Sequence, residues 1–192
     1  MVFLIFLLIL ILPCASKADG LLLKFGSGWS SISGYEELFK DYPVYLLERD
    51  VYPSFSISFS QEFKSYYFEG GTEFLGVSST FYFYSGDVKE YRLTGGYIFA
   101  GGGFKKDLKG LVFKGGIEGF FKFYEKFSVD GSDYSTDFLS DFFPAVVFTV
   151  DAFLTKRLCL FAVFKNSLGK VLSTPIAEGS WNSFNLGVGF RL

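Results

Sequence analysis

Histidine is absent from this chain of 192 residues, which also has only one methionine and two cysteines. Without histidine, the chain lacks the commonest general base of enzymes and the commonest protein ligand of metal ions. The formal net charge is only −2, so neither sign dominates and there is no electrostatic case for a nucleic-acid partner. These absences exclude most familiar catalytic and metal sites, and we expect no catalytic residue, no cofactor and no metal.

Helix-favouring alanine and glutamine are scarce, whereas aromatic residues make up 21% of the chain, with 27 Phe, 12 Tyr and 22 Gly. Aromatic side chains favour strands, and glycine permits close approach of neighbouring backbones. The length is that of one domain. Composition therefore predicts a single all-β domain.

The N-terminus has the pattern of a cleaved export signal. Residues 2–12 are an unbroken apolar run, shorter than the about 20 residues that a spanning helix needs. Ser16 and Ala18 stand at the −3 and −1 positions of a signal-peptidase site. We therefore expect a signal peptide at 1–18 and a mature barrel domain at 19–192.

Cys14 leaves an alternative open for this segment. In a lipoprotein it would be the modified residue, although Pro13 directly before it does not fit the usual sequence around such a cysteine. Removal of the segment leaves Cys159 as the remaining thiol, so no intramolecular disulfide is expected.

Eight segments of the mature chain alternate apolar and polar side chains with a period of two, which predicts strands with one apolar face. In the last segment, apolar Phe184, Leu186, Val188 and Phe190 alternate with polar or small residues up to the chain end. The eight predicted strands are 21–29, 54–63, 66–84, 88–104, 110–124, 143–154, 158–166 and 182–192.

The connections between these strands alternate in length. Three are short and basic, at 64–65, 105–109 and 155–157, and three are long, at 30–53, 125–142 and 167–181. A tight hairpin at 85–87 joins two strands that exceed the about 9–11 residues needed to span a membrane. This arrangement predicts an eight-stranded antiparallel up-and-down β-barrel with both termini at the short-turn end.

The two faces of the strands differ in what could fill a barrel. One face carries bulky Phe, Tyr, Leu and Ile, too many for the narrow lumen of eight strands. A soluble lipocalin-like barrel would have that face inside, but its Gly-x-Trp signature is absent, because Ser27 stands two residues before Trp29. We therefore expect the apolar face toward lipid and a polar lumen network comprising Lys24, Glu69, Glu73, Arg92, Lys114, Glu118, Lys122, Asp151, Lys165 and Arg191.

Counting along the predicted hairpins places Glu73 level with Ala100, and Ala100 level with Lys114. The small Ala100 side chain would let Glu73 and Lys114 meet across it, with Glu118 and Arg92 nearby. Because buried charges persist only when they are paired, we expect an ion-pair network that plugs the barrel. Ion conduction along the same side chains is the alternative.

The spacing of Asn185, Gly187, Phe190 and Leu192 resembles the C-terminal assembly signal of bacterial outer-membrane β-barrel proteins, which usually ends in Phe or Trp. With its strand pattern, the whole mature chain resembles the small eight-stranded OmpA/OmpX-type barrels. That resemblance implies the cell outer membrane, contact with its lipid and lipopolysaccharide, and recognition of the last strand by the barrel-assembly machinery.

The resemblance leaves several functions open. In the eight-stranded lipid A deacylases and palmitoyl transferases a histidine takes part in catalysis, so neither mechanism carries over. We expect a non-enzymatic protein with a structural or surface-contact role through its long loops and the overlong hairpin at 80–89, which could bind a surface protein by strand addition. The alternatives are a narrow OmpW-like channel for small or hydrophobic solutes and an enzyme acting on outer-membrane lipid.

Overall fold

The computed structural model describes residues 20–35, 37, 44–50, 52–174 and 178–192. The expected signal peptide and its cleavage site lie outside the described residues. No helix in these described ranges is long and apolar enough to cross a membrane.

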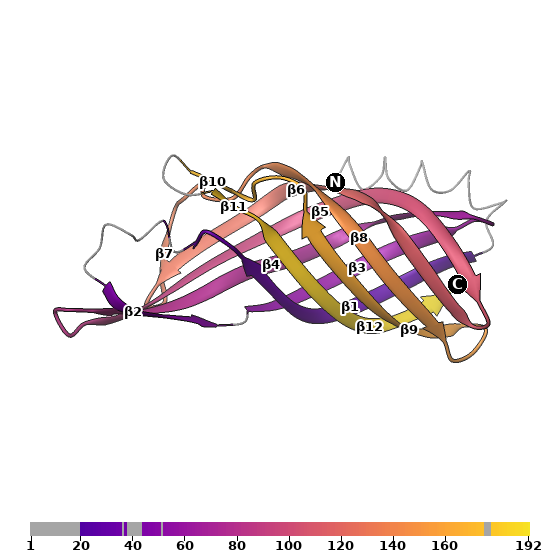
Figure 1. The fold of residues 1–192 in the computed structure, drawn as a ribbon, viewed down its shortest axis with the longest axis horizontal. Helices are drawn as coiled ribbons and strands as arrows, with labels where there is room; N and C mark the ends of the chain where they lie inside the picture. Colours follow the sequence, from indigo (N-terminus) through magenta and orange to yellow (C-terminus); the bar gives the residue numbers. More distant parts are fainter. Residues whose placement is uncertain (1–19, 36, 38–43, 51, 175–177) are drawn as a thin grey trace.

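Eight long strands form a closed antiparallel ring (Figure 1). Their order around the ring is the order of the chain, and pairing of β1 with β12 closes it. Closure leaves no unpaired edge in the ring, and this confirms the predicted eight-stranded up-and-down barrel. The ring strands are β1 (Gly20–Ile32), β3 (Tyr52–Glu62), β4 (Tyr66–Phe83), β5 (Val88–Leu108), β6 (Leu111–Val129), β8 (Phe142–Phe153), β9 (Leu158–Ser167) and β12 (Trp181–Arg191).

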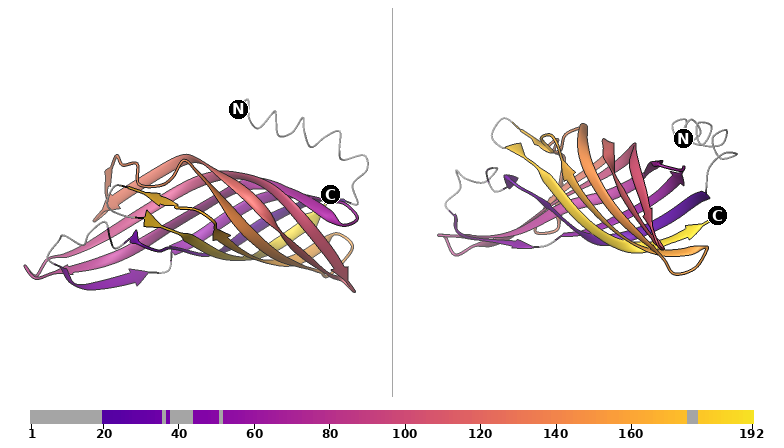
Figure 2. Two further views of the ribbon diagram at one scale, coloured as in Figure 1. Left: turned by 45° about the horizontal axis from the view of Figure 1, so that its top comes forward. Right: turned by 45° about the vertical axis from the view of Figure 1, so that its right-hand side comes forward.

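Four short strands lie beyond the ring at the long-loop end, which we name the outer end; the short-turn end is the inner end. β2 (Val44–Asp50) pairs with the last residues of β4, along the edge that β3 occupies lower down. β7 (Ser132–Tyr134) pairs with β6, and β10 (Leu172–Ser173) pairs with β11 (Glu178–Gly179). Both views in Figure 2 show the sheet of β4 and β5 continuing well past the shorter strands of the barrel.

The turn between β5 and β6 is tighter than the sequence predicts. Pairing continues to Leu108 and Leu111, so that only Lys109 and Gly110 form the turn. Both have positive φ angles, 45° and 94°, as a two-residue hairpin of the mirror-image type requires. The predicted turn at 105–109 was therefore wrong, because the alternation of side chains continues through these basic residues.

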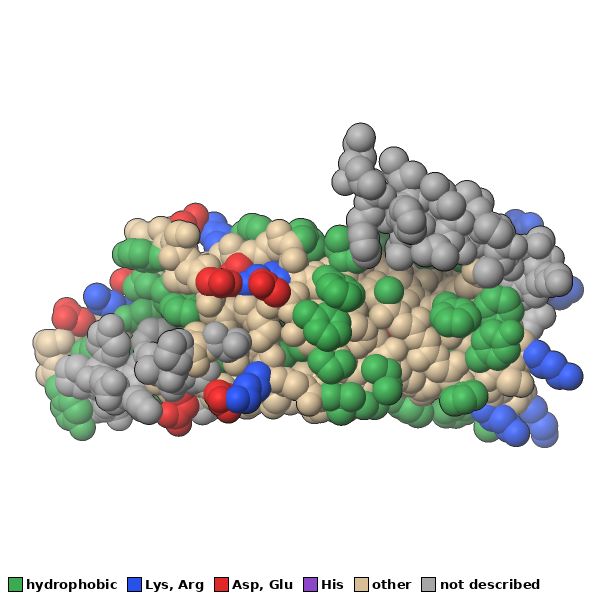
Figure 3. All heavy atoms as spheres, turned by 90° about the horizontal axis from the view of Figure 1, so that it is seen from above, with side chains coloured by type: hydrophobic (Ala, Val, Ile, Leu, Met, Phe, Trp, Pro, Cys, Tyr) green, Lys and Arg blue, Asp and Glu red, His purple; other side chains and the backbone are tan. Residues whose placement is uncertain are grey.

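The outer surface of the ring carries exposed apolar side chains on every strand. Alternation predicts this outward face for seven strands and is wrong on β5, where Leu93, Tyr97 and Phe99 of the expected lipid-facing side are buried. Figure 3 shows hydrophobic side chains over the middle of the molecule, between ends that carry most of the charges. Such a surface around a closed barrel suits lipid, because the backbone groups are all paired within the ring. Representative exposed residues, strand by strand, are Phe25, Ile57, Phe68, Phe104, Ile117, Phe148, Phe164 and Leu186.

Glycines allow the strands β5 and β6 to approach closely. A Cβ atom at Gly101 would lie 2.1 Å from the carbonyl oxygen of Ile117, and one at Gly103 would lie 2.0 Å from that of Gly115. Real Cβ atoms do not come this near to backbone. The run from Gly101 to Gly103 therefore serves the tight curvature of the barrel, as the sequence predicts for glycine within a strand.

Candidate functional site

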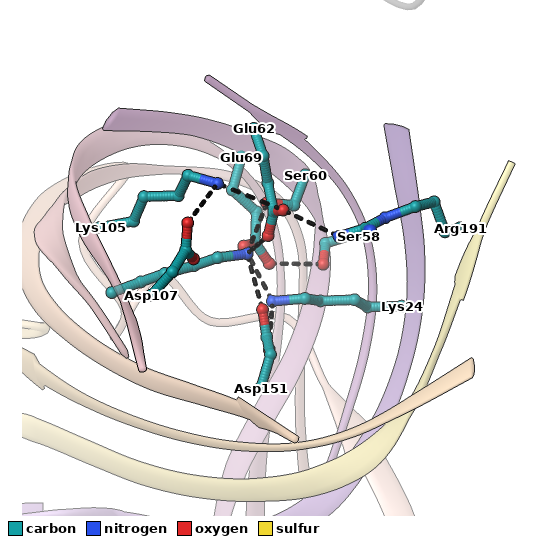
Figure 4. Close-up of polar contacts among 10 residues, drawn as sticks. Lys24, Ser58, Ser60, Glu62, Glu69, Lys105, Asp107, Asp151 and Arg191 are labelled. Atoms are coloured by element: carbon teal, nitrogen blue, oxygen red, sulfur yellow. Dashed lines mark hydrogen bonds and ion pairs between the residues drawn. The ribbon is translucent and has the colours of Figure 1, made fainter. Parts of the chain in front are cut away.

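The lumen is the candidate site, and its inner half is filled by ion pairs. The ammonium nitrogen of Lys24 lies 3.3 Å from Glu69 Oε2 and 3.1 Å from Asp151 Oδ1. The ammonium nitrogen of Lys114 lies 2.7 Å from Asp151 Oδ2 and 2.7 Å from Glu62 Oε1. Asp151 thus bridges two lysines, and its side chain is fully buried. Figure 4 shows Asp151 beside Lys24 within this network.

The same network extends to the inner mouth through Glu62. Lys105 Nζ lies 3.6 Å from Glu62 Oε2, and Arg191 Nη2 lies 3.2 Å from the same oxygen. We name this network the ion-pair layer. It comprises four cations and four anions, so its charges balance: Lys24, Lys105, Lys114, Arg191, Glu62, Glu69, Asp107 and Asp151.

A second cluster lies further along the lumen, around Lys165. Its ammonium nitrogen lies 2.8 Å from Glu73 Oε2 and 2.9 Å from Glu118 Oε2. The other oxygen of Glu73 accepts hydrogen bonds from Ser183 Oγ at 3.2 Å and Asn185 Nδ2 at 3.0 Å. All three charged side chains are at most 3% exposed, so each charge has the others as its partners in place of water.

The outer half of the lumen is filled by rings. Phe120 stacks on Phe143 with ring centroids 5.0 Å apart, and both meet Trp181, at 5.1 and 5.4 Å. Tyr97 lies 5.0 Å from Phe143, and Phe99 lies 5.3 Å from Phe120. These five residues, each at most 1% exposed, are the aromatic layer. The Tyr97 hydroxyl donates a hydrogen bond to the Ser140 carbonyl at 3.0 Å, which ties the layer to the segment before β8.

The second cluster meets the aromatic layer at Lys165. Its ammonium group lies 3.8 Å from the ring centre of Phe99 and 5.0 Å from that of Phe120. A cation over an aromatic face is attracted by the ring quadrupole. One side chain therefore joins the charged filling to the aromatic filling.

The structure places nine of the ten predicted lumen residues in three ways. Lys24, Glu69, Glu73, Lys114, Glu118, Asp151 and Lys165 lie inside the lumen. Arg191 lies at the inner mouth with its side chain 31% exposed. Lys122 lies near the outer mouth, where it binds Glu125 of its own strand and two acids of the segment before β8, Asp137 and Asp141, rather than the two inner clusters.

Arg92 is the prediction that the structure contradicts. Its side chain is 55% exposed, and it pairs with the neighbouring Glu90 instead of a lumen carboxylate. The apolar residues of this part of β5, among them Leu93 and Tyr97, point inward and are fully buried. We name the band of exposed apolar side chains around the ring, among them Phe25, Ile57 and Phe148, the apolar belt. Beyond it, on this part of β5, polar Arg92 is exposed and apolar Leu93 is buried, so the polarity of the two faces is reversed.

The predicted contact between Glu73 and Lys114 was also wrong. Glu73 pairs in register with Tyr97, whereas Ala100 pairs with Gly70 and Gly119. Both hairpins differ from the predicted count: in β4–β5 the partner of Glu73 is Tyr97, and in β5–β6 the two-residue turn after Leu108 pairs Ala100 with Gly119 instead of Lys114. Glu73 therefore meets Lys165, and Lys114 meets Asp151 and Glu62.

Sequence reasoning missed several members of the filling. Lys105 was assigned to a turn, although its alternation with Gly103 and Gly101 marks it as inward-facing. Trp181 and the other aromatic-layer residues carry no sequence signal that separates them from lipid-facing rings, because both groups are aromatic and alternate with a period of two.

The four residues of the C-terminal motif lie on the strand that closes the ring. Asn185 points into the lumen and is fully buried, whereas Phe190 is 45% exposed on the outside. Gly187 pairs with Gly26 of β1, where a Cβ would lie 2.0 Å from the Phe25 carbonyl oxygen. The backbone N–H of Leu192 donates to the carbonyl of Leu21 at 2.9 Å. The last residue is thus held in the ring.

A closed ring of eight antiparallel strands, with an apolar exterior and a polar, filled interior, defines the class of small outer-membrane-type barrels. Neisserial surface protein A (NspA) has a similar structure, with a TM-score of 0.56 and 15% identity over 91% of this chain and 99% of that chain. Ail, the attachment invasion locus protein of Yersinia pestis, is similar with a TM-score of 0.52 and 14% identity over 91% and 99%. The chain therefore has the fold of the OmpA/OmpX-type outer-membrane barrels. No protein-family model and no curated protein matches the sequence.

Proposed function

We propose that this protein is a non-enzymatic outer-membrane barrel whose lumen is closed and whose role is surface contact through its outer end. The observation that carries this proposal is the lobe formed where β4, β5 and β6 continue past the apolar belt. We name it the outer lobe. It is a folded body with its own core rather than a set of long loops.

The core of the outer lobe is aromatic. Tyr91 lies between Phe81 and Phe127, with ring centroids 4.9 and 6.1 Å apart, and Phe127 packs on Phe138 at 5.2 Å. β2 and β7 widen the sheet on either side of these residues. Because the lobe is ordered before any partner arrives, binding would cost little conformational entropy.

The tip of the lobe presents apolar side chains to the outside. Tyr84 is 76% exposed and Val88 is 54% exposed at the hairpin between β4 and β5, and Tyr134 of β7 is 54% exposed. Amphipathic tyrosines offer contact area at low entropic cost, which suits a protein-binding surface. The edge of β4 at this level is taken by β2, so strand addition would have to occur at β2 or β7 instead.

The surface role can be tested in cells that produce the full-length protein in their outer membrane. A variant with Tyr84→Ser and Val88→Ser removes the apolar tip, and Phe25→Leu on the belt is the matched control. Contact between cells is measured by how fast a cell suspension sediments. Relative to cells with the wild-type protein, we expect slower sedimentation with the tip variant and unchanged sedimentation with the Phe25→Leu control. If cells with either variant sediment at the same rate as cells without the protein, the proposal of contact between cells is contradicted.

The narrow-channel alternative is disfavoured by the filling of the lumen. Any solute path would have to pass both the ion-pair layer and the aromatic layer, whose side chains are at most 10% exposed apart from Asp107 and Arg191 at the inner mouth. Liposome swelling with small sugars and amino acids measures such a path, and we expect no swelling above that of empty liposomes.

The enzymatic alternative would need a nucleophile with a base at hand. The buried serines of the lumen serve structure: Ser58 donates to Glu69 at 2.6 Å, and Ser60 accepts from Lys114 at 3.2 Å. We expect no release of fatty acid from labelled lipid A incubated with the folded protein, and turnover there would overturn the non-enzymatic assignment.

We also propose that the assembly machinery recognises the terminal strand through Asn185, Gly187, Phe190 and Leu192. Support comes from the place of this strand, which must pair with β1 to close the ring. Leu192→Phe should leave the folded fraction in the membrane unchanged or raise it, as read from heat-modifiable gel mobility. Loss of folded protein would contradict this reading of the motif.

A further inference from the structure

Exposed positive charge is concentrated at the inner end of the barrel. The hairpin turns there carry five exposed cations and one exposed acid, Asp107, and Figure 3 shows basic side chains gathered at that end. At the outer end, exposed acids outnumber exposed bases, and Lys126 and Lys170 are paired with Asp133 and Glu178. We name the five inner cations the basic collar: Lys64, Lys106, Lys109, Lys156 and Arg157.

The collar is separate from the ion-pair layer. Lys105 and Arg191, at the same height, turn inward and bind Glu62. Lys106 points outward, and within the part of the chain that the structure describes no carboxylate lies within 4.0 Å of the five collar cations. Their charges are therefore available to a ligand outside the barrel.

The collar borders the apolar belt. Phe104, 79% exposed, stands on the same outward face as Lys106, and Leu154, 60% exposed, stands two residues before Lys156. Tyr66, 47% exposed, follows Lys64 at the start of β4. Each cation is thus held within a few residues of a side chain that faces lipid, which is the depth of the headgroups.

The collar also surrounds the barrel. Its residues come from the turns β3–β4, β5–β6 and β8–β9, three successive hairpins around the ring. One protein or polymer docking on a single side could not cover all three, whereas a shell of lipids could. Charge, depth and circular arrangement together point to many small anionic ligands in the plane of the membrane.

We propose that the basic collar binds the anionic phospholipid headgroups of the membrane leaflet at the short-turn end. It would anchor that end at a fixed depth and enrich anionic lipid around the barrel. The attraction is electrostatic at a membrane surface, so it falls off over a Debye length of about 8 Å at physiological ionic strength. This inference goes beyond the surface role proposed above, because it concerns the opposite end of the molecule.

The test uses the full mature protein reconstituted in phosphatidylcholine vesicles that contain spin-labelled phosphatidylglycerol or spin-labelled phosphatidylcholine. Electron spin resonance separates lipid held at the protein from bulk lipid. We expect phosphatidylglycerol to be preferred by about fivefold, as one cation close to one anionic headgroup would give, and 1 M NaCl to weaken the preference.

The collar variant replaces all five cations with glutamine. It should lose the preference, while the variant with Lys89, Lys126 and Lys170 replaced by glutamine at the outer end should keep it. The charge-conserving variant, with Arg157→Lys and with Lys→Arg at 64, 106, 109 and 156, should also keep the preference for phosphatidylglycerol. Heat-modifiable mobility checks that each variant is folded. If the variant with all five substitutions does not fold, three further variants can each neutralise the cations of one turn. Each of these should lose part of the preference for phosphatidylglycerol.

Equal association of the two lipids with the wild-type protein would overturn the proposal, and so would an unchanged preference in the collar variants. Binding of soluble polyphosphate by the collar, with no preference among lipids, would assign it to a periplasmic polymer and likewise overturn the proposal. None of these outcomes bears on the outer lobe, so the two proposals can fail independently.

Discussion

The inner and outer halves of the lumen are filled by opposite kinds of side chain. The ion-pair layer joins four cations to four anions, whereas the aromatic layer joins five rings around Phe120 and Trp181. In the first, each charge needs its partners, because an unpaired charge in a dry interior is costly. In the second, each ring needs neighbours of complementary shape. One barrel of constant strand number is thus filled by ion pairs in its inner half and by packed rings in its outer half.

The kind of side chain that fills each half of the lumen follows from the residues that line it. Glycine and serine are frequent on the inner walls of β3, β4 and β5, and they leave room for long Lys and Glu side chains. Towards the outer mouth the lumen continues into the core of the outer lobe, where Leu139 and Leu172 also pack. The aromatic layer is therefore the base of that core as much as a plug of the barrel.

The aromatic layer should respond most strongly to truncation at its centre. Phe120→Ala should lower the free energy of unfolding by about 4 kcal/mol, because it leaves a cavity among Phe99, Phe143 and Trp181. Urea unfolding in vesicles, followed by tryptophan fluorescence, measures the loss. The matched control is Phe121→Ala on the lipid-facing side, and an equal loss there would show that packing inside the lumen adds nothing.

The ion-pair layer should respond to the loss of its bridging anion. Asp151→Asn leaves Lys24 and Lys114 with one anionic partner each and should cost about 3 kcal/mol in the same assay. Asp107→Asn is the control, because its side chain is 58% exposed at the rim and binds only Lys105. A loss at Asp107 as large as that at Asp151 would contradict the burial of the layer.

Double substitutions measure how strongly residues are coupled within the ion-pair layer and between the two layers. Asp151→Asn with Lys114→Met should cost less than the sum of the two single substitutions, by about 2 kcal/mol, because the unpaired charge is removed with its partner. Phe120→Ala combined with Asp151→Asn should be nearly additive if the layers act independently. Additivity within the ion pair would show that the pairing contributes little.

The smallest effect is expected at Arg92. Its pair with Glu90 is exposed, so Arg92→Gln should change the free energy of unfolding by less than about 0.5 kcal/mol. Lys165→Gln, inside the lumen, is the contrasting variant and should cost several times more. A large loss at Arg92 would place its side chain in the lumen after all.

Much of this architecture could be predicted from period-two alternation. It identified the eight ring strands, the outward faces of seven of them and the inward direction of seven charged side chains. On β5 it failed, because the apolar side chains expected to face lipid, among them Tyr97 and Phe99, are buried in the lumen. Alternation says which face a residue occupies but nothing about register, so it could not pair Glu73 with Lys165. The register of β5 on β6 depended on the turn at Lys109 and Gly110, where five residues were expected and two are present, and the register of β4 on β5 pairs Glu73 with Tyr97 instead of Ala100.

The aromatic layer and the reversal at Arg92 could not be predicted for a second reason. A ring that faces lipid and a ring that faces a lumen look alike in sequence, since both lie on an alternating apolar face. What separates them is the height along the barrel at which lipid ends and water begins. That height is set by the whole assembly of strands and loops rather than by any local pattern.

We propose that the ion-pair layer and the aromatic layer together block the lumen to ions. Electrical conductance of the purified, folded protein in a planar bilayer tests it most directly. A closed lumen predicts no steady single-channel conductance in 1 M KCl, with the same result after Arg92→Gln. Reproducible open steps of uniform size in the wild-type protein would contradict the claim and would favour the channel alternative.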